Sequence, residues 1–249
     1  MNSTSWYLAY DKKPYARIRL FCFHHSGGAA SMYYPWIKGL SSNIELIAIQ
    51  LPGREGRFTE PLTDNLTEIL GILTEGFNSY QDKPFFIFGH SLGGLLAYQF
   101  TKSLYQRYSF LPKKLIVSAT KAPHLPFRMK HMSKLDGEAL IEELKVYSGI
   151  DENILNDNEL LQIFLPIIKS DFSISETYRH KNSCPLSCDI LALSGKDDKT
   201  VSEREAQAWS EYTSGKFKHL SFSGGHFFIK EHHEEILKLI NQIGNSYIL

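Results

Sequence analysis

The chain contains a serine, an acid and a histidine in the contexts that nucleophilic catalysis requires. Ser91 is the centre of a Gly-x-Ser-x-Gly motif, Asp197 and Asp198 follow an apolar run, and His226 follows two glycines. Serine is a poor nucleophile at its own pKa, so it needs an adjacent base and a third group that orients this base. In such a site His226 would accept the proton of Ser91 and return it to the leaving group.

The acid is one of two neighbouring aspartates. The spacing Gly195-x-x-Asp198-x-x-Val201 is usual for an acid loop that follows a strand, so we predict Asp198. Asp197 is the alternative; if Asp198 is the acid, Asp197 would cap the following turn or accept hydrogen bonds from loop amides. Among ten histidines we predict His226 as the base, because two glycines give it an exposed loop directly after a predicted strand.

A predicted strand and a predicted helix flank Ser91. The run from Phe85 to Phe88 suits a buried strand, and the stretch from Leu95 to Phe100 suits a helix with one apolar face. Gly89 and Gly93 lack the β-carbons that would collide where strand and helix approach, and the strained turn would expose the serine Oγ. The first N–H groups of the helix would point to the same place and stabilise an oxyanion. The simpler alternative is that Ser91 only caps the helix.

Strands and helices alternate over most of the chain, which predicts a mostly parallel sheet with helices on both faces. Ser91, the aspartates and His226 each follow a strand, so parallel strands would bring them to one edge of the sheet. The chain order of serine, aspartate and histidine is that of an α/β-hydrolase. Besides the run before Ser91, the predicted strands are residues 18–23, 44–51, 114–119, 189–194 and 217–222; the predicted helices are residues 31–40, 62–80 and 202–212, with a closing helix to about 243.

The alternation stops between residues 123 and 184. This stretch has prolines, basic residues and short helical patterns at 137–147 and 158–169, and it predicts a helical lid over the active site. Its apolar residues would either line an acyl channel or pack the lid onto the body. They include Leu125, Phe127, Met129, Met132, Leu144, Ile154, Leu161, Phe164, Leu165, Ile167 and Ile168.

Composition excludes several classes of function. A chain of 249 residues with 43% hydrophobic content can form a single domain spanning residues 1–249. Equal numbers of basic and acidic residues, 27 each, give no general attraction to nucleic acid or to an anionic membrane. No signal segment or bilayer-spanning run is evident, and the three cysteines are too few for a disulfide framework, so we expect a cytoplasmic protein.

A metal site or a bound cofactor is not expected. The neighbours His24 and His25 are the strongest candidates for metal ligands, but adjacent side chains on an extended segment point to opposite faces. No third ligand for a metal is evident in the sequence.

Five segments together resemble the type II thioesterases that accompany non-ribosomal peptide and polyketide synthetases. The segments are LFCFHHSGG at 20–28, QLPGRE at 50–55, GHSLGG at 89–94, LPIIKSD at 165–171 and GGHFF at 224–228. The resemblance implies hydrolysis of acyl or aminoacyl thioesters held on the phosphopantetheine arm of a carrier protein, which clears misprimed or stalled synthetases.

The resemblance also implies residue roles. Ser91, Asp198 and His226 would form a catalytic triad, and the backbone N–H groups of Leu92 and Ser26 would form the oxyanion hole. The chain departs from the family where His24 and Ser26 replace a usual proline and alanine, and where Lys169 replaces a usual arginine. Backbone donors survive a change of side chain, so these departures bear on substrate preference or docking rather than on catalysis.

The implied partner is an acidic acyl or peptidyl carrier protein, and the enzyme is expected to be a monomer. A neutral enzyme would need a basic rim to meet an acidic partner; the candidates are Arg128, Lys130, Lys134, Lys169, Arg179 and Lys181. Three alternatives stay open at this point: a general serine esterase or acyl-CoA thioesterase, a non-catalytic module that docks on a synthetase, and acyl transfer to an acceptor other than water.

Overall fold

The computed structural model describes residues 6–128, 130–146 and 157–247, and seven strands of this part of the chain form one sheet. The strand order is β1-β3-β2-β4-β5-β6-β7; β1 runs antiparallel to β3, and the other neighbours are parallel. The strands are β1 (Tyr7–Leu8), β2 (Ile18–Phe23), β3 (Ile44–Ile49), β4 (Phe85–His90), β5 (Lys114–Ser118), β6 (Asp189–Gly195) and β7 (Phe217–Phe222). The mostly parallel sheet predicted from the sequence is therefore confirmed.

Strand β1 was not predicted, because a strand of two residues has no periodic pattern. Two aromatic residues of this N-terminal segment, Trp6 and Tyr7, are buried. The hydroxyl of Tyr7 donates a hydrogen bond to the Leu73 carbonyl at 2.5 Å, which ties the edge strand to a helix of the body.

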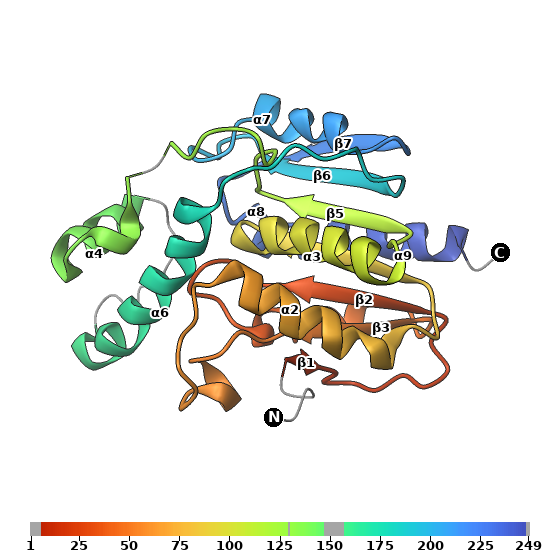
Figure 1. The fold of residues 1–249 in the computed structure, drawn as a ribbon, viewed down its shortest axis with the longest axis horizontal. Helices are drawn as coiled ribbons and strands as arrows, with labels where there is room; N and C mark the ends of the chain where they lie inside the picture. Colours follow the sequence, from red (N-terminus) through yellow and green to blue (C-terminus); the bar gives the residue numbers. More distant parts are fainter. Residues whose placement is uncertain (1–5, 129, 147–156, 248–249) are drawn as a thin grey trace.

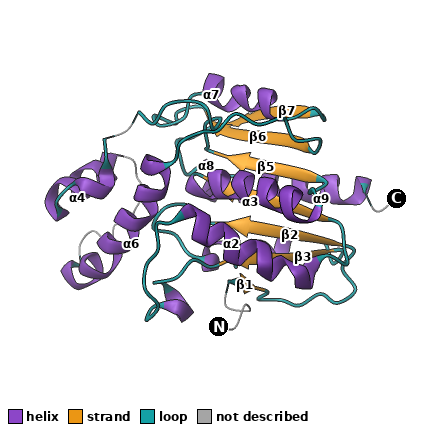
Figure 2. Ribbon diagram, viewed as in Figure 1, coloured by secondary structure: helices purple, strands orange, loops and turns teal. Residues whose placement is uncertain are grey.

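Helices cover both faces of the sheet (Figures 1 and 2). One face carries α2 (Leu66–Gly76) and α3 (Leu92–Tyr108), and the other carries α1 (Trp36–Gly39), α8 (Phe228–Glu231) and α9 (His233–Ser246). Successive side chains of β4 point to opposite faces, so Phe85 and Ile87 join the first core, whereas Phe86 and Phe88 join the second. Every residue of β4 is buried, as the aromatic run before Ser91 predicted.

Side-chain caps decide where two predicted helices begin. Helix α2 starts later than expected, because the Asn65 side chain accepts hydrogen bonds from the amides of Thr67 and Glu68. Helix α7 (Glu203–Gln207) starts at a capping box formed by Ser202 and Glu205. Both helices continue as 3-10 turns, over Phe77–Tyr80 and Ala208–Tyr212. The helix predicted at 31–40 is a 3-10 turn at Ala30–Tyr33 followed by α1.

The insertion between β5 and β6 consists of helices joined by loops in its described residues, and none of the named strands lies there. It holds a 3-10 turn at Met132–Lys134, α4 (Gly137–Val146) and α6 (Asn158–Thr177). Helix α6 runs eight residues beyond its predicted end at 169; Tyr147, the predicted end of the preceding helix, lies outside the described residues. In Figure 1 both helices lie beyond the arrowheads of the parallel strands. The assignment of residues 1–249 to one domain stays a prediction.

In the described part of the chain, the helices are too short or too polar to cross a bilayer.

The crossing of β4 and α3 leads to a first prediction, on Gly93. A β-carbon at Gly93 would lie 2.2 Å from the Phe23 carbonyl oxygen, whereas one at Gly71, on the exposed side of α2, would meet nothing within 4 Å. We expect Gly93→Ala to destabilise the fold by about 1–3 kcal/mol or more through overpacking, and Gly71→Ala to stabilise it by about 0.5–1 kcal/mol. Urea unfolding of both variants tests this. Equal stability of the two proteins would contradict it.

Candidate active site

Ser91 occupies a strained turn between β4 and α3. Its backbone has φ 56° and ψ −121°, a conformation that L residues rarely adopt, and its side chain makes no cap hydrogen bond to the helix. Hydrogen bonds fix the turn on both sides: the Ser91 amide donates to the Ser118 carbonyl at 2.8 Å, and the Thr120 hydroxyl donates to the Ser91 carbonyl at 2.6 Å. The alternative that Ser91 merely caps α3 is therefore wrong.

A continuous chain of hydrogen bonds joins Ser91, His226 and Asp198. The Oγ of Ser91 lies 2.9 Å from Nε2 of His226, and Nδ1 of the same ring lies 2.8 Å from Oδ2 of Asp198. The three side chains come from the loops after β4, β6 and β7, which parallel pairing brings to one edge of the sheet. This is the arrangement in which histidine removes a proton from serine and an aspartate stabilises the imidazolium that forms.

The side chain of Asp198 is fully buried, yet it is held as a carboxylate. Burial by itself would raise its pKa, but hydrogen bonds from His226 and Thr200 outweigh this effect, so the pKa lies below its usual value. The second oxygen, Oδ1, accepts hydrogen bonds from the Thr200 amide and hydroxyl, both at 2.8 Å, and from the Val201 amide at 3.2 Å. These bonds orient the oxygen that faces His226.

Asp197 has a different place in the structure. Its Oδ2 accepts a hydrogen bond from the Gly224 amide at 3.2 Å, and its own amide donates to the Gly224 carbonyl at 3.0 Å. Asp197 thus joins the acid loop to the loop that carries His226, which is the loop-amide contact expected of it. Only Asp198 of the pair contacts the imidazole.

The two predicted oxyanion donors flank the same cavity as Ser91. Leu92 is the first residue of α3, and Ser26 lies on the loop after β2; both residues line the cavity together with Ser91 and His226. Neither amide is engaged in a hydrogen bond within the described part of the chain. Their role as oxyanion donors stays a prediction.

A cavity of about 850 Å³ opens at Ser91 between the sheet edge and the insertion. Five of the predicted channel residues line it: Leu125, Phe127, Leu144, Phe164 and Ile168. Met132, Leu161, Leu165 and Ile167 are not among its lining residues, so these do not form the channel wall. Met129 and Ile154 lie outside the described residues.

Some lining residues were missed by the sequence reasoning. Met32, Leu95 and Phe172 are apolar members of the wall. One signal could have found Leu95, since residues three apart on a helix share a face and Leu92 was already placed at the site.

Part of the cavity wall is polar. The Gln99 side-chain amide donates to the Tyr178 hydroxyl at 2.8 Å, and this hydroxyl lies 3.2 Å from Nδ1 of His180. The Tyr212 hydroxyl then bridges His180 Nε2 at 3.3 Å and His124 Nδ1 at 2.9 Å. His124, Tyr178 and His180 line the cavity, so its wall offers hydrogen-bonding groups as well as hydrocarbon.

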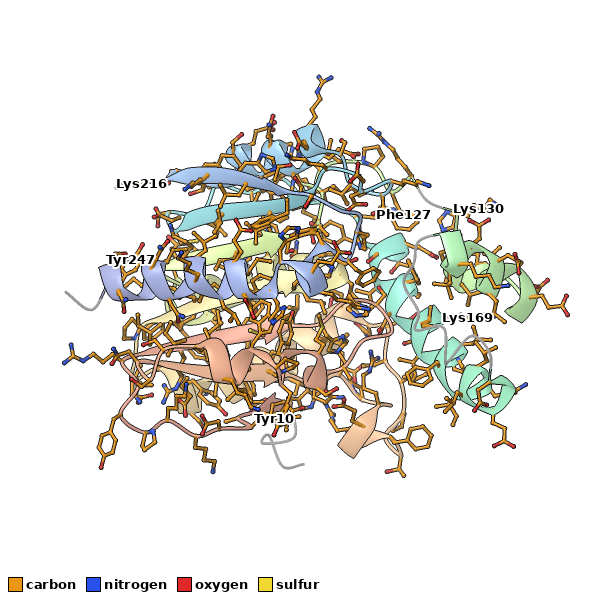
Figure 3. All side chains as sticks on the ribbon, turned by 180° about the vertical axis from the view of Figure 1, so that it is seen from behind. Tyr10, Phe127, Lys130, Lys169, Lys216 and Tyr247 are labelled. Carbon is orange, nitrogen blue, oxygen red and sulfur yellow. The ribbon has the colours of Figure 1, made fainter. Side chains whose placement is uncertain are left out.

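Basic residues also reach the cavity. Of the six predicted for a basic rim, Arg128 and Arg179 line it, and the unpredicted Lys121 and Lys230 line it as well. Arg128 is paired with Glu205 at 3.4 Å. The remaining four do not line it: Lys130, Lys134, Lys169 and Lys181. In Figure 3, Lys130 and Lys169 lie on the side of the insertion, at the opposite end of the molecule from Lys216 and Tyr247.

His24 and His25 are bonded to backbone rather than arranged for a metal. Nδ1 of His24 lies 2.8 Å from the His25 carbonyl, and Nδ1 of His25 lies 2.9 Å from the Ser26 carbonyl. Among the described residues, no three His, Cys, Asp or Glu side chains are placed to hold a metal ion together.

A second prediction separates the two neighbouring aspartates. Asp198→Asn removes the charge that stabilises the His226 imidazolium, so we expect the kcat for a nitrophenyl ester to fall by roughly 10³–10⁴-fold. Asp197→Asn keeps a side-chain oxygen for the Gly224 amide and should change kcat by less than about tenfold. Steady-state kinetics of both variants test this, and a larger loss in Asp197→Asn would reverse the assignment.

A third prediction concerns stability and pH. Burial lowers the pKa of the imidazoles of His24, His25 and His90, that of His25 to about 4. These rings are neutral in the folded protein and take up protons on unfolding, so the free energy of unfolding should decrease as the pH falls from about 6.5 to about 4.5. Urea unfolding at several pH values measures this, with an unchanged m value as the control. A constant free energy over this range would contradict the prediction.

Comparison with known proteins identifies the family. The thioesterase domain model matches residues 18–243. The gramicidin S biosynthesis protein GrsT of Aneurinibacillus migulanus is 34% identical over 235 residues, which cover 94% of this chain and 92% of GrsT. Thioesterase PikA5 of Streptomyces venezuelae is 35% identical over 238 residues, covering 95% of this chain and 84% of PikA5. The structure of the type II thioesterase BorB from the borrelidin biosynthetic cluster superposes with a TM-score of 0.88 at 34% identity, covering 97% of this chain and 98% of BorB. The chain therefore belongs to the type II thioesterases, hydrolases of the α/β-hydrolase fold that act on thioesters.

Proposed function

We propose that the enzyme hydrolyses acyl and aminoacyl thioesters from the phosphopantetheine arm of carrier proteins, and so clears misprimed or stalled non-ribosomal peptide or polyketide synthetases. The observation that carries the proposal is the hydrogen-bonded chain from Ser91 through His226 to Asp198 at a cavity of about 850 Å³. The relatives GrsT and PikA5 and the similar structure of BorB support the pathway type.

The first half of the reaction forms an acyl-enzyme. Nε2 of His226 accepts the Ser91 proton while Oγ attacks the thioester carbonyl carbon, and the carbonyl oxygen becomes an oxyanion. The amides of Leu92 and Ser26 donate to this oxyanion. When the C–S bond breaks, the imidazolium returns its proton to the leaving thiol, and the acyl group stays on Ser91.

The second half releases the acid. A water molecule, deprotonated by His226, attacks the acyl-enzyme, and the same two amides stabilise the second oxyanion. Collapse of this intermediate breaks the bond to Oγ, and His226 returns the proton to Ser91. Asp198 remains a carboxylate throughout and stabilises each imidazolium, which agrees with its lowered pKa.

A thioester suits a site of this kind. Its carbonyl has little resonance stabilisation and its thiol is a good leaving group, so a triad with modest binding energy suffices. The cavity wall combines apolar residues such as Phe164 with the hydroxyl and imidazole groups of Tyr178 and His180. Such a wall accommodates acyl groups of mixed polarity rather than one hydrocarbon chain.

The proposed partner is an acidic carrier protein. Lys121, Arg128, Arg179 and Lys230 line the cavity, and their positive charge would attract an acidic carrier that docks there. No resident cofactor is proposed, since the substrate itself carries the phosphopantetheine. A monomeric state and a cytoplasmic location stay predictions.

A fourth prediction tests the substrate class directly. Acylated and aminoacylated carrier proteins are incubated with enzyme, and intact mass spectrometry follows loss of the acyl mass, with acyl-CoA and nitrophenyl esters assayed in parallel. We expect cleavage of the carrier thioesters to be faster than that of the small substrates. The control is Ser91→Ala, which removes the nucleophile and should abolish cleavage and labelling by a fluorophosphonate probe.

Three other outcomes would replace the proposal. Intact carriers beside rapidly cleaved small esters would indicate a general esterase. Absence of probe labelling in the wild-type enzyme would indicate a docking module. Appearance of the acyl group on an added alcohol or amine, in place of free acid, would indicate an acyltransferase.

A further inference from the structure

A buried ion pair lies behind the loop that carries Ser26. Arg54 and Asp171 form a bidentate pair, with Nη1 2.7 Å from Oδ2 and Nη2 2.8 Å from Oδ1. The side chains are 5% and 0% exposed. Arg54 follows β3 and Asp171 belongs to α6 of the insertion, so the pair connects the body to the insertion. The two residues come from the QLPGRE and LPIIKSD segments, which the reaction itself does not use.

Both partners of the pair also bond the loop between β2 and the 3-10 turn at Ala30. The Gly27 amide donates to Oδ2 of Asp171 at 2.7 Å. Nη1 of Arg54 donates to the Gly28 carbonyl at 3.0 Å. Ser26, whose amide is the proposed oxyanion donor, directly precedes these two glycines. The pair therefore fixes the peptide groups next to that donor.

The loop touches α6 closely as well. Gly27 has φ +72°, and a β-carbon there would lie 2.7 Å from Cγ1 of Ile168, a residue one turn before Asp171 on α6. A further link runs through Gln50, whose side-chain oxygen accepts from the Ala30 amide at 2.6 Å and whose side-chain nitrogen donates to the Arg54 carbonyl at 3.2 Å. The loop is thus held from β3 on one side and from α6 on the other.

We propose that Arg54 and Asp171 are positioning residues for the oxyanion hole, and that seating of helix α6 on the body sets the Ser26 amide. The proposal rests on the proposed reaction at Ser91. The physical basis is that a buried ion pair keeps one geometry. Any shift would leave a buried lone pair or N–H group without a hydrogen-bond partner, which costs free energy. A hydrophobic contact would hold α6 without fixing the direction of a neighbouring N–H group.

The consequence is a link between the insertion and catalysis. If α6 moves away from the body, the hydrogen bond between the Gly27 amide and Asp171 breaks, and Arg54 loses its ion-pair partner. The oxyanion hole is then incomplete although Ser91, His226 and Asp198 keep their contacts. The enzyme therefore hydrolyses a bound thioester efficiently only when α6 is packed on the body, and slowly when α6 has moved away from it.

The test uses Asp171→Asn, which keeps an oxygen for the Gly27 amide but removes the charge that holds Arg54. Loss of oxyanion positioning should lower kcat by roughly 10–100-fold with KM within about threefold. A thioether trifluoromethyl ketone, which forms a tetrahedral adduct with the serine, should bind more weakly by a similar factor. Binding of the free acid product, which has no oxyanion, should stay unchanged. Arg54→Lys, a milder change, is measured in the same way and should lose less.

The matched control is Glu45→Gln. Glu45 pairs with Arg19 at 3.1 Å with both side chains 10% exposed, and this pair joins the N-terminal ends of β2 and β3, away from the site. A general loss of stability would therefore affect both variants, whereas only Asp171→Asn should weaken binding of the ketone. Thermal unfolding of each variant shows whether the comparison is made at similar stability.

The outcomes separate this proposal from the proposed function. Unchanged kcat and ketone affinity in both Asp171→Asn and Arg54→Lys would overturn the positioning role, and so would an equal loss of ketone affinity in Glu45→Gln. If the wild type cleaved no carrier thioester but Asp171→Asn still lost ketone affinity and esterase kcat, the substrate assignment alone would be wrong.

Discussion

The close crossing of strand β4 and helix α3 is the constraint on which the rest of the site depends. A β-carbon at Gly89 would lie 2.0 Å from the Gly93 carbonyl, and one at Gly93 would lie 2.2 Å from the Phe23 carbonyl, so only glycine fits at both positions. This approach forces Ser91 into its positive φ and directs Oγ to His226 rather than to the helix amides. It also brings the end of β2, and with it the loop containing Ser26, beside the start of α3.

Of the histidines His24, His25, His90 and His226, the last is the one whose ring faces a carboxylate, and this decides where positive charge is stabilised. His24, His25 and His90 are bonded to a carbonyl or a hydroxyl, and burial keeps them neutral. His226 differs from these three because Nδ1 faces the buried carboxylate of Asp198. A positive charge that develops at the site is therefore stabilised on His226, next to the serine that gives up its proton.

The insertion contributes to the site in two ways. Its apolar side chains, among them Phe127, Phe164 and Ile168, form much of the cavity wall. Asp171, on the same helix as Ile168, reaches into the body and bonds both Arg54 and the glycine loop. The insertion, which the sequence predicts to be a lid, is thus joined by a buried ion pair to the loop that carries Ser26.

The sequence by itself determined the order of the six longer strands along the chain, the turn at Ser91, and the loops that carry Asp198 and His226, because these depend on local patterns. Periodicity marked each long strand, and glycine spacing marked the loops. Tertiary structure decided what depends on distant partners. Strand β1 is too short to show a pattern, and α6 continues to Thr177 although its sequence pattern predicted an end at residue 169. The meeting of Arg54 with Asp171 joins residues 117 positions apart. The choice of Asp198 over Asp197 rested on a usual spacing, and the structure supplies its physical reason, since only one of two adjacent side chains can point at His226.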